Sequence, residues 1–520
     1  MSGSTVRDAV LELLRAFRMT TVFGNPGSTE LPLFRNFPAE FRYVLGLQES
    51  LVVGMADGFA QATRNAALVN LHSAVGVGHA MGNIFTAYRN QTPLVITAGQ
   101  QARSIMPFEP FLFASQATEM PQPYVKWACE PASAENVPAA IARAYYVAMQ
   151  PPCGPTFVSI PVDDWDRSCV LIEPRQVSSV VRGDPALLAE CARELSAAQR
   201  PAIVAGASVA RDNAWDELLA LAERHNAPVW VSPMSARNSF PENHRLFAGF
   251  LHADRAKIVQ SLSGYDLILV LGAPLFTYHV EGSGPHAPPA SRVFHLTDDP
   301  SIASWAPVGS SVVTSLRPGI LELLDGPAPP ARAQPPPLVR PERLCGGPLT
   351  DGYLLQQMAA LRPAGSIVVE EAPSTRGAMH DYLPILERDT FYTCASGGLG
   401  HGLPAAVGVS LARPAEKVIA LLGDGSSLYA IQGLWSAAQW QLPIVFIIVN
   451  NGRYEALRQF GQHFGLGNTC GTELPGVDFS ALARGQGLQA ERVSTAERLD
   501  EALRRAFSAA APVLLDVIVQ

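Results

Sequence analysis

The sequence lacks the features that mark several large classes of protein. Its seven cysteines are scattered and form no CxxC pair, which argues against a disulfide framework or a zinc site and predicts ordinary small core residues. No apolar run approaches the roughly 20 residues of a membrane-spanning helix. The formal net charge of −8 leaves no basic footprint, so neither nucleic acid nor an anionic membrane is expected as a partner.

The amino-terminal stretch also lacks the pattern of a secretory signal. Residues 6–17, VRDAVLELLRAF, are typical of an amphipathic helix with charges of both signs. They contain no long apolar segment and no small-residue cleavage site. The sequence therefore predicts a cytoplasmic protein.

What the chain has is length and a repeated alternation of strands and helices. At about 150 residues per domain, 520 residues suggest three domains. Short apolar strands alternate with helical patterns in each third, which predicts an α/β fold of three doubly wound parallel-sheet domains. The predicted domains are 1–170, 185–325 and 349–520, and the proline-rich residues 326–348 are the predicted linker between the last two.

Two polar residues follow strand-like runs in the last of these domains. Asp424 lies in VIALLGDGSSLY, and Asn451 ends PIVFIIVNN 27 positions later. We expect a buried strand over 418–422, a crossover helix over 430–441 and a second buried strand over 443–449. Asp424 and Asn451 then lie at the carboxyl ends of neighbouring parallel strands, where open α/β sheets bind ligands.

A carboxylate and an amide oxygen are suitable ligands for Mg²⁺ or Ca²⁺, because hard cations take oxygen donors and leave positions open for phosphate oxygens. Gly423 and Gly425 would let the backbone approach such a ligand. The pattern therefore predicts a divalent cation that holds a diphosphate. The alternative is that GDG and NN are two ordinary turns.

Motifs in the amino-terminal third support one family. TVFGNPGSTELPLF, LQESLVVGMADGFAQAT, VNLHSAVGVGHAMGN and PLVITAGQQ, with the GDGS…NN pair, resemble the thiamin-diphosphate-dependent 2-oxo-acid decarboxylases, and most closely their benzoylformate decarboxylase branch. The resemblance covers nearly the whole chain and is weakest in the middle third. It implies a pyrimidine-binding domain, a central domain and a diphosphate-binding domain, in that order.

The resemblance implies roles for four catalytic residues. Glu49 would hydrogen-bond N1′ of the cofactor's aminopyrimidine, and Ser28 would bind the substrate carboxylate. His72 would assist charge development at the former keto oxygen, and His279 would protonate the enamine carbon. Taken alone, the same residues could be a helix-start acid, a turn serine and two structural histidines. His72 is expected to end a strand and to precede a glycine-rich turn.

The resemblance also implies a set of cofactor contacts and metal ligands. Cofactor contacts are expected at Asn25, Pro26, Gly27, Ser374, Gly397, Leu399, Gly423, Gly425, Ser426 and Tyr454, and metal ligands at Asp424, Asn451 and the carbonyl of Arg453. The chain departs from the pattern of the nearest relatives at Thr29, Val77, His79, Phe111, Pro373 and Glu455. At position 79 the relatives carry an asparagine, and at 111 a leucine. These departures concern the substrate more than the cofactor.

The implied reaction is the non-oxidative decarboxylation of an aromatic 2-oxo acid, phenylglyoxylate-like, to an aldehyde and CO₂ through the cofactor's ylid and an enamine. The implied cofactors are thiamin diphosphate and Mg²⁺ or Ca²⁺. The implied assembly is a homo-oligomer, a dimer at minimum and usually a tetramer, with sites at subunit interfaces.

Three alternatives remain beside this reaction. A carboligase of the acetolactate-synthase type would use the same cofactor, and the paired histidines favour protonation over carboligation. A dinucleotide-dependent oxidoreductase needs GxGxxG, which GVGHAMG and GGLGHGLP do not match. A non-catalytic homologue is disfavoured because Glu49 and both histidines are present.

Overall fold

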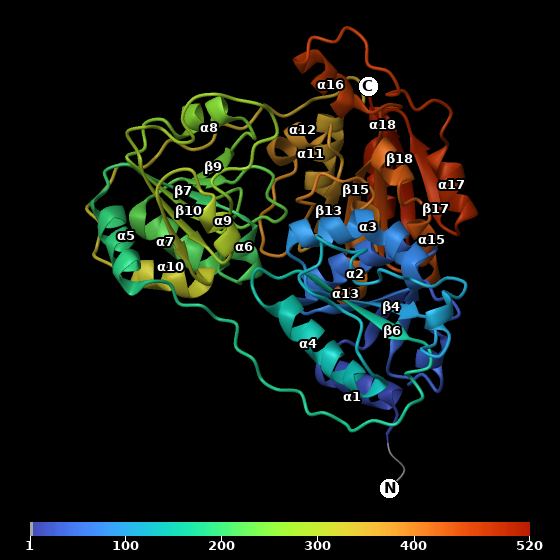
Figure 1. Ribbon diagram of the computed structural model, residues 1–520. Helices are drawn as coiled ribbons and strands as arrows, with labels where there is room; N and C mark the ends of the chain where they lie inside the picture. The colour runs from blue at the N-terminus through green and yellow to red at the C-terminus, as the bar shows by residue number, and fades with distance from the viewer. Residues whose placement is uncertain (1–3) are drawn as a thin grey trace. The chain divides into compact units, whose positions relative to one another are not determined.

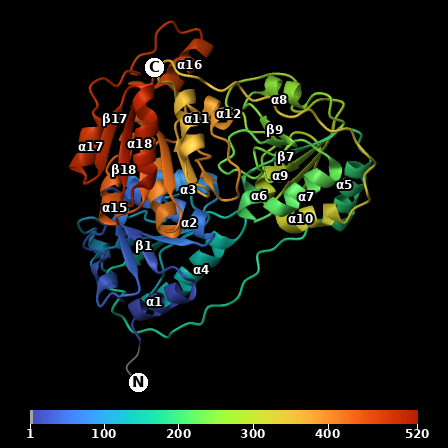
Figure 2. The ribbon, with the colours of Figure 1, turned by 180° about the vertical axis from the view of Figure 1, so that it is seen from behind.

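The computed structural model describes residues 4–520 and contains three six-stranded parallel β-sheets with helices packed against them (Figures 1 and 2). The predicted α/β class with three parallel sheets is therefore confirmed. The chain forms two compact units, the first made of the chain up to Ser178 with residues 345–376 and 396–520, and the second of residues 179–344 and 377–395. The domain boundaries remain predictions.

The first sheet has the strand order β2-β1-β3-β4-β6-β5. Helices α1 and α4 cover one face and α2 and α3 the other, which makes the sheet doubly wound (Figure 1). Its strands are β1 Thr21–Gly24, β2 Arg42–Leu45, β3 Ala67–Leu71, β4 Leu94–Gln100, β5 Ala128–Cys129 and β6 Pro155–Pro161. Its helices are α1 Val6–Ala16, α2 Glu49–Thr63, α3 Ser73–Asn90 and α4 Val137–Met149, with short 3₁₀ turns η1 Leu31–Phe34, η2 Met106–Phe108 and η3 Ala134–Asn136.

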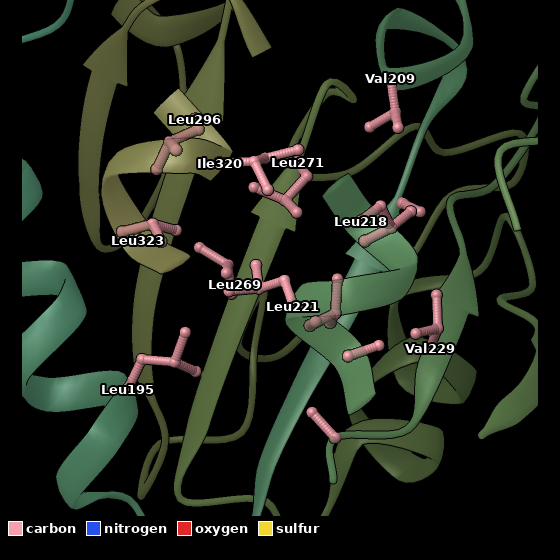
Figure 3. Packing of buried hydrophobic residues seen from close by; sticks show 14 of the residues in the cluster. Leu195, Val209, Leu218, Leu221, Val229, Leu269, Leu271, Leu296, Ile320 and Leu323 are labelled. Carbon is pink, nitrogen blue, oxygen red and sulfur yellow. The ribbon is translucent and has the colours of Figure 1, made fainter. Parts of the chain in front are cut away.

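The second sheet has the order β12-β11-β10-β7-β8-β9. Leucines of its central strand β10 pack between α7 and α10, as Leu269, Leu271, Leu221 and Leu323 show in Figure 3. Each such side chain, removed from water, contributes about 1.5–3 kcal/mol. The strands are β7 Pro201–Ala205, β8 Val229–Val231, β9 Phe247–Phe250, β10 Leu267–Leu271, β11 Arg292–Thr297 and β12 Ser310–Val313. The helices are α5 Pro185–Ala197, α6 Ala207–Arg211, α7 Trp215–His225, α8 Arg255–Leu262, α9 Pro300–Ser304 and α10 Leu316–Leu324.

The third sheet has the order β14-β13-β15-β16-β18-β17. Strands β15 and β16 are buried along their whole length, as near-continuous apolar runs in a parallel sheet require. The strands are β13 Ile367–Glu371, β14 Phe391–Tyr392, β15 Val418–Gly423, β16 Ile444–Asn450, β17 Gln489–Val493 and β18 Val513–Ile518. The helices are α11 Asp351–Leu361, α12 Arg376–Tyr382, α13 Gly402–Ala412, α14 Asp424–Leu428, α15 Gly433–Gln439, α16 Glu455–His463, α17 Phe479–Gly485 and α18 Ala496–Ser508.

Two local expectations were wrong. The crossover after β15 is two short helices, α14 and α15, instead of one helix over 430–441. Serines that bond the backbone, such as Ser427 to the Gly423 carbonyl at 2.7 Å, favour such interruptions. The glycine-rich stretch after His72 is not a turn but the 18-residue helix α3, because its apolar residues Val77, Ala80 and Ile84 recur at helical spacing and are buried.

The cysteines are only partly the core residues that we expected. All seven are free, and Cys191 and Cys394 are buried, whereas Cys345 and Cys470 are exposed. Composition counts cysteines but does not say which ones fall in loops. Within residues 4–520 no helix is long and apolar enough to cross a membrane.

The linker over 326–348 contains no helix or strand, but hydrogen bonds hold it at several points, among them Arg340, which donates to the carbonyls of Glu242 and His380. Arg332 donates hydrogen bonds to the carbonyls of Leu195, Ser196 and Ala198 at the end of α5, and to that of His225 at the end of α7. A guanidinium suits this place because the last carbonyls of a helix have no partners within the helix.

Candidate functional site

Asp424 and Asn451 lie at the same edge of the third sheet. Strands β15 and β16 are neighbours in register, and Asp424 begins α14 directly after β15. The Asp424 Oδ2 atom accepts hydrogen bonds from the backbone N–H of Gly452 at 2.7 Å and of Arg453 at 3.2 Å. The loop after β16 is therefore folded onto the Asp424 carboxylate, as the predicted βαβ arrangement requires.

The oxygen atoms of this cluster are not saturated by hydrogen bonds. A carboxylate offers about four lone-pair positions, and Asp424 uses three of them for backbone N–H groups, one of which is Gly425 N at 2.7 Å from Oδ1. The Asn451 Oδ1 atom accepts a hydrogen bond from Arg453 N at 3.1 Å. Burial raises the pKa of Asp424, while the N–H groups oppose that effect. The donors that remain are oxygens, which Mg²⁺ and Ca²⁺ prefer.

Small residues and an aromatic ring surround this cluster. A Cβ atom on Gly425 would overlap the ring of Tyr454, so only glycine permits the ring to lie there. Ser426 is buried in the first turn of α14. The charge that Glu455 brings to the loop is matched, because Arg453 Nε donates to Glu455 Oε2 at 2.7 Å.

The loop that carries Gly397 and Leu399 is held by a buried carboxylate that the sequence did not reveal. Glu371 accepts hydrogen bonds from the backbone N–H of Gly400 at 2.6 Å and from that of Gly402. Burial raises the pKa of Glu371 to about 7. Gly397 has φ +70°, a conformation that favours glycine, at the exposed crest of the loop.

A second buried carboxylate holds the same loop to the first sheet's helices. His401 Nε2 lies 2.5 Å from Asp57 Oδ2 on α2, and Asn90 Nδ2 donates to the same oxygen at 2.7 Å. Asp57 and His401 are almost fully buried. Within the first unit this pair joins α2, which begins at Glu49, to the loop after β14.

The remaining diphosphate-side residue, Ser374, is half-buried in the turn between β13 and α12. Pro373 beside it is exposed. Among the described residues, no group of three His, Cys, Asp or Glu side chains gathers in a way that could hold a metal ion. Any cation at this edge would therefore depend on the mixed set of carboxylate, amide and carbonyl oxygens.

At the edge of the first sheet, His72 is fixed by a carboxylate that the sequence also did not reveal. His72 Nδ1 lies 2.9 Å from Glu30 Oε2, and Glu30 also accepts from the backbone N–H groups of Gly27 at 2.8 Å and Gly99 at 2.9 Å. Because Nδ1 is engaged, Nε2 is the ring nitrogen that can meet a substrate. Glu30 follows Ser28 by two positions in GSTE. This closeness in sequence to a predicted site residue was the only indication that Glu30 belongs to the site.

The turn before Glu30 is partly exposed to solvent, and at Gly27 it packs closely against His72. Asn25, Pro26, Gly27 and Ser28 follow β1, and Pro26 and Ser28 are exposed. A Cβ atom on Gly27 would overlap the ring of His72. Glycine at 27 therefore lets the Ser28 turn lie directly against His72.

Two residues with left-handed backbone conformations lie next to His72. Ser73 has φ +47° and Leu112 has φ +63°, and the Ser73 hydroxyl donates to the Leu112 carbonyl at 2.7 Å. Such conformations are uncommon outside glycine and are often found at functional sites. The bond sets the position of the Phe111–Leu112 segment, and Phe111 itself is 87% exposed in this chain.

Glu49 is buried at the start of α2, and both of its oxygens have side-chain partners. Oε1 accepts from Asn25 Nδ2 at 3.3 Å, and Oε2 lies 3.0 Å from His79 Nδ1 on α3. Glu49, at the start of α2, is thus in contact with two residues outside its own helix.

His279 lies in the second unit, on the exposed loop that follows β10. Its backbone N–H donates to the Ala253 carbonyl at 2.9 Å. Its predicted role remains a prediction.

Three family models match successive parts of the chain. The thiamine pyrophosphate enzyme N-terminal TPP binding domain matches residues 4–122, the central domain matches 188–323, and the C-terminal TPP binding domain matches 373–517.

Full-length relatives match as well. Benzoylformate decarboxylase of Pseudomonas aeruginosa is 44% identical over 522 residues, which cover 99% of each chain. The structure of the thiamine diphosphate-dependent 4-hydroxybenzoylformate decarboxylase of Rhodococcus jostii RHA1 is 41% identical, with a TM-score of 0.96 and 99% of each chain covered. That of benzoylformate decarboxylase from Polynucleobacter necessarius is 39% identical, with a TM-score of 0.96 and coverage of 99% of this chain and 98% of that one.

Proposed function

Because the chain belongs to the thiamine pyrophosphate enzyme family, we propose that it decarboxylates an aromatic 2-oxo acid of the benzoylformate type to the aldehyde and CO₂. The family predicted from the motifs is confirmed by the full-length identity of 44%. The bound cofactor would supply the nucleophilic carbon and the electron sink. The chain's own residues must then bind the 2-oxo acid, orient it and move protons.

The pair of His72 and Glu30 is the observation that carries this reaction. Decarboxylation to an aldehyde needs a proton donor beside the reacting carbon and oxygen, and an imidazole with one nitrogen fixed by a carboxylate presents the other nitrogen in one orientation. Ser28, exposed beside His72, is suitably placed to bind the carboxylate of the substrate. His279 is the second proposed proton donor.

Glu49 is the proposed partner of the cofactor's pyrimidine ring. It is a buried carboxyl group that can share a proton with a ring nitrogen, whereas its contacts with Asn25 and His79 hold it in place. Gly397 and Leu399 are proposed to contact the same ring from the diphosphate-binding domain.

The proposed cation is Mg²⁺, or Ca²⁺ in its place. Asp424 and Asn451 would each contribute one side-chain oxygen, and Arg453 its carbonyl oxygen. Gly423, Gly425, Ser426, Ser374 and Tyr454 would surround the diphosphate, with backbone N–H groups at the start of α14 as donors.

The geometry of α3 supports a site that is shared between two copies of the chain. Glu49 contacts α3 at His79, whereas the Gly397 loop contacts α3 at Thr86, whose Oγ1 lies 2.9 Å from Ser396 Oγ. At 1.5 Å per residue these two contacts are about 10 Å apart along the helix. This separation favours a site in which Glu49 of one chain and Gly397 of another contact the same cofactor ring. We therefore propose a dimer as the minimal active form and a tetramer as its usual form.

The test is CO₂ release from a panel of 2-oxo acids, with and without added thiamin diphosphate and Mg²⁺. We expect phenylglyoxylate to be decarboxylated far better than pyruvate, and only in the presence of the cofactor. His72→Ala and His279→Ala should each lower kcat, because a proton donor is lost. His244→Ala, which removes an imidazole paired with Glu223 at 3.3 Å, is the matched control and should leave kcat unchanged.

Two results would contradict the proposal. A preference for pyruvate, with acetolactate as the product, would indicate a carboligase of the acetolactate-synthase type. Unchanged kcat in both histidine variants would show that His72 and His279 are not the proton donors, and the substrate class would then be undecided.

A further inference from the structure

The Glu49 carboxylate is held asymmetrically. Its contact with Asn25 Nδ2 is long, at 3.3 Å, whereas its contact with His79 Nδ1 is 3.0 Å. Both contacts are made to the same carboxylate, and hydrogen bonds to a carboxylate are strongest when they are short. His79 is therefore the stronger of the two partners that fix the orientation of Glu49.

The position of His79 on the helix also favours this contact. A Cβ atom on Gly76, one turn earlier on α3, would lie 3.6 Å from Glu49 Oε1, so the helix backbone passes close to the carboxylate. The Gln48 side chain, next to Glu49, donates to the His79 carbonyl at 3.3 Å. The start of α2 and the middle of α3 are thus joined by both side-chain and backbone atoms.

Burial differs sharply between the two members of the pair. The Glu49 side chain is 11% exposed and that of His79 is 57% exposed in this chain. Because the imidazole is largely exposed, its contact with Glu49 contributes little to the stability of the fold. The contact does restrict which Glu49 oxygen is available, because Oε2 faces His79 and Oε1 is left with the longer bond.

We infer that His79 is a positioning residue for Glu49: its Nδ1–H donates to Oε2, fixes the carboxyl plane and leaves Oε1 to exchange a proton with the cofactor ring. This inference rests on the proposed function of Glu49. An asparagine at this position would retain a donor nitrogen the same number of bonds from the main chain as the imidazole Nδ1. The essential property is then the donor and not the ring.

The first test measures exchange of the cofactor's C2 proton with deuterium in the reconstituted protein, by quenched-flow NMR. His79→Leu, which keeps apolar bulk but has no donor, should slow the exchange about tenfold. His79→Asn should restore it to within about threefold of the original rate, because its amide can donate to Oε2. Thermal unfolding of both variants should match the parent protein, and His244→Leu should leave the exchange unchanged.

The second test needs no cofactor. In cofactor-free protein labelled with ¹⁵N-histidine, the His79 ring signals, identified by their loss in His79→Asn, should report a proton on Nδ1. They should shift when Glu49 is replaced by Gln, and not when Glu223 is replaced by Gln.

Each outcome decides one question. If His79→Leu exchanges as fast as the parent, or if His79→Asn is as slow as His79→Leu, the positioning role is overturned. Unmoved His79 signals in Glu49→Gln would overturn it as well. Failure of the parent protein to bind thiamin diphosphate or to exchange the C2 proton would instead overturn the proposed function.

Discussion

The two edges that carry the predicted site hold their functional groups by different means. At the edge of the first sheet, carboxylates face imidazoles: Glu30 faces His72 at 2.9 Å, and Glu49 faces His79 at 3.0 Å. At the edge of the third sheet, Asp424 is held by backbone N–H groups. Side-chain pairs can exchange protons, whereas backbone amides can only fix a position. The first edge is therefore suited to proton transfer, and the third to holding charge in place.

The largest effect is expected where a proton must move. Glu49→Gln should lower the decarboxylation rate by at least about 10²-fold, because an amide cannot share its proton as a carboxyl does. Binding of thiamin diphosphate, followed by calorimetry, should largely persist. The control is Glu40→Gln, which removes an exposed carboxylate paired with Arg15 and should have no effect on the rate. Near-normal turnover in Glu49→Gln would show that the first edge is not a proton-transfer site.

The next effect concerns the buried pair that joins the two regions within one chain. Although burial opposes the charged form, the Asp57 carboxylate raises the pKa of His401. Because the folded-state pKa is raised, the stabilisation is complete below the unfolded value of about 6.5 and is lost as pH rises through the folded value. His401→Gln should therefore cost about 3 kcal/mol at pH 6, the lower end for a broken buried pair, and less at pH 9. Urea unfolding at both pH values measures this, and equal losses at the two would contradict it.

A smaller effect should separate binding from proton transfer at the third edge. Asp424→Ala should weaken the retention of Mg²⁺ and thiamin diphosphate by at least about 10- to 100-fold, the range known for residues that only support metal ligands. Saturating cofactor should recover much of the rate. Asp478→Ala removes an exposed aspartate that caps α17 by accepting from Ala481 N, and it serves as the control. If excess cofactor does not recover the rate, Asp424 acts in the chemical step as well as in binding, and the contrast between the two edges is contradicted.

The smallest effect is expected at Ser28. Ser28→Ala should raise KM for phenylglyoxylate about tenfold, with kcat little changed, because one hydrogen bond to a charged carboxylate is lost. Steady-state kinetics with phenylglyoxylate and its 4-hydroxy derivative measure this. We also expect the 4-hydroxy derivative to be processed poorly, since Phe111 is bulkier than leucine. A lower kcat at unchanged KM would place Ser28 in the chemical step instead.

The same contrast explains what the sequence could predict. Asp424, Asn451 and Arg453 lie on two consecutive strand ends, so one stretch of sequence was enough to place them together. Apolar runs such as IVFIIVN predicted the parallel sheets for a similar reason, since burial on both faces requires them.

The carboxylates that hold His72 and the Gly397 loop could not be predicted in this way. Glu30 follows β1 and His72 follows β3, Glu371 ends β13 and meets Gly400 29 residues later, and Asp57 on α2 lies 344 residues from His401. A sequence does not show which of its carboxylates are buried or what they contact, so the role of these three could be recognised only from the structure. Helix α3 was missed for another reason, because its glycines are typical of a turn although its buried apolar residues recur at helical spacing.

The crossing of α2 and α13 has a consequence for inheritance. A Cβ atom on Gly58 would overlap the Ala405 carbonyl, and one on Gly408 would overlap that of Met55, so the helices meet backbone to backbone. Neither surface can gain a methyl group unless the other recedes. In chimeras of homologous enzymes, segments carrying these two helices should therefore be viable only when both come from one parent, so recombination should preserve them as a linked pair although more than 300 residues separate them.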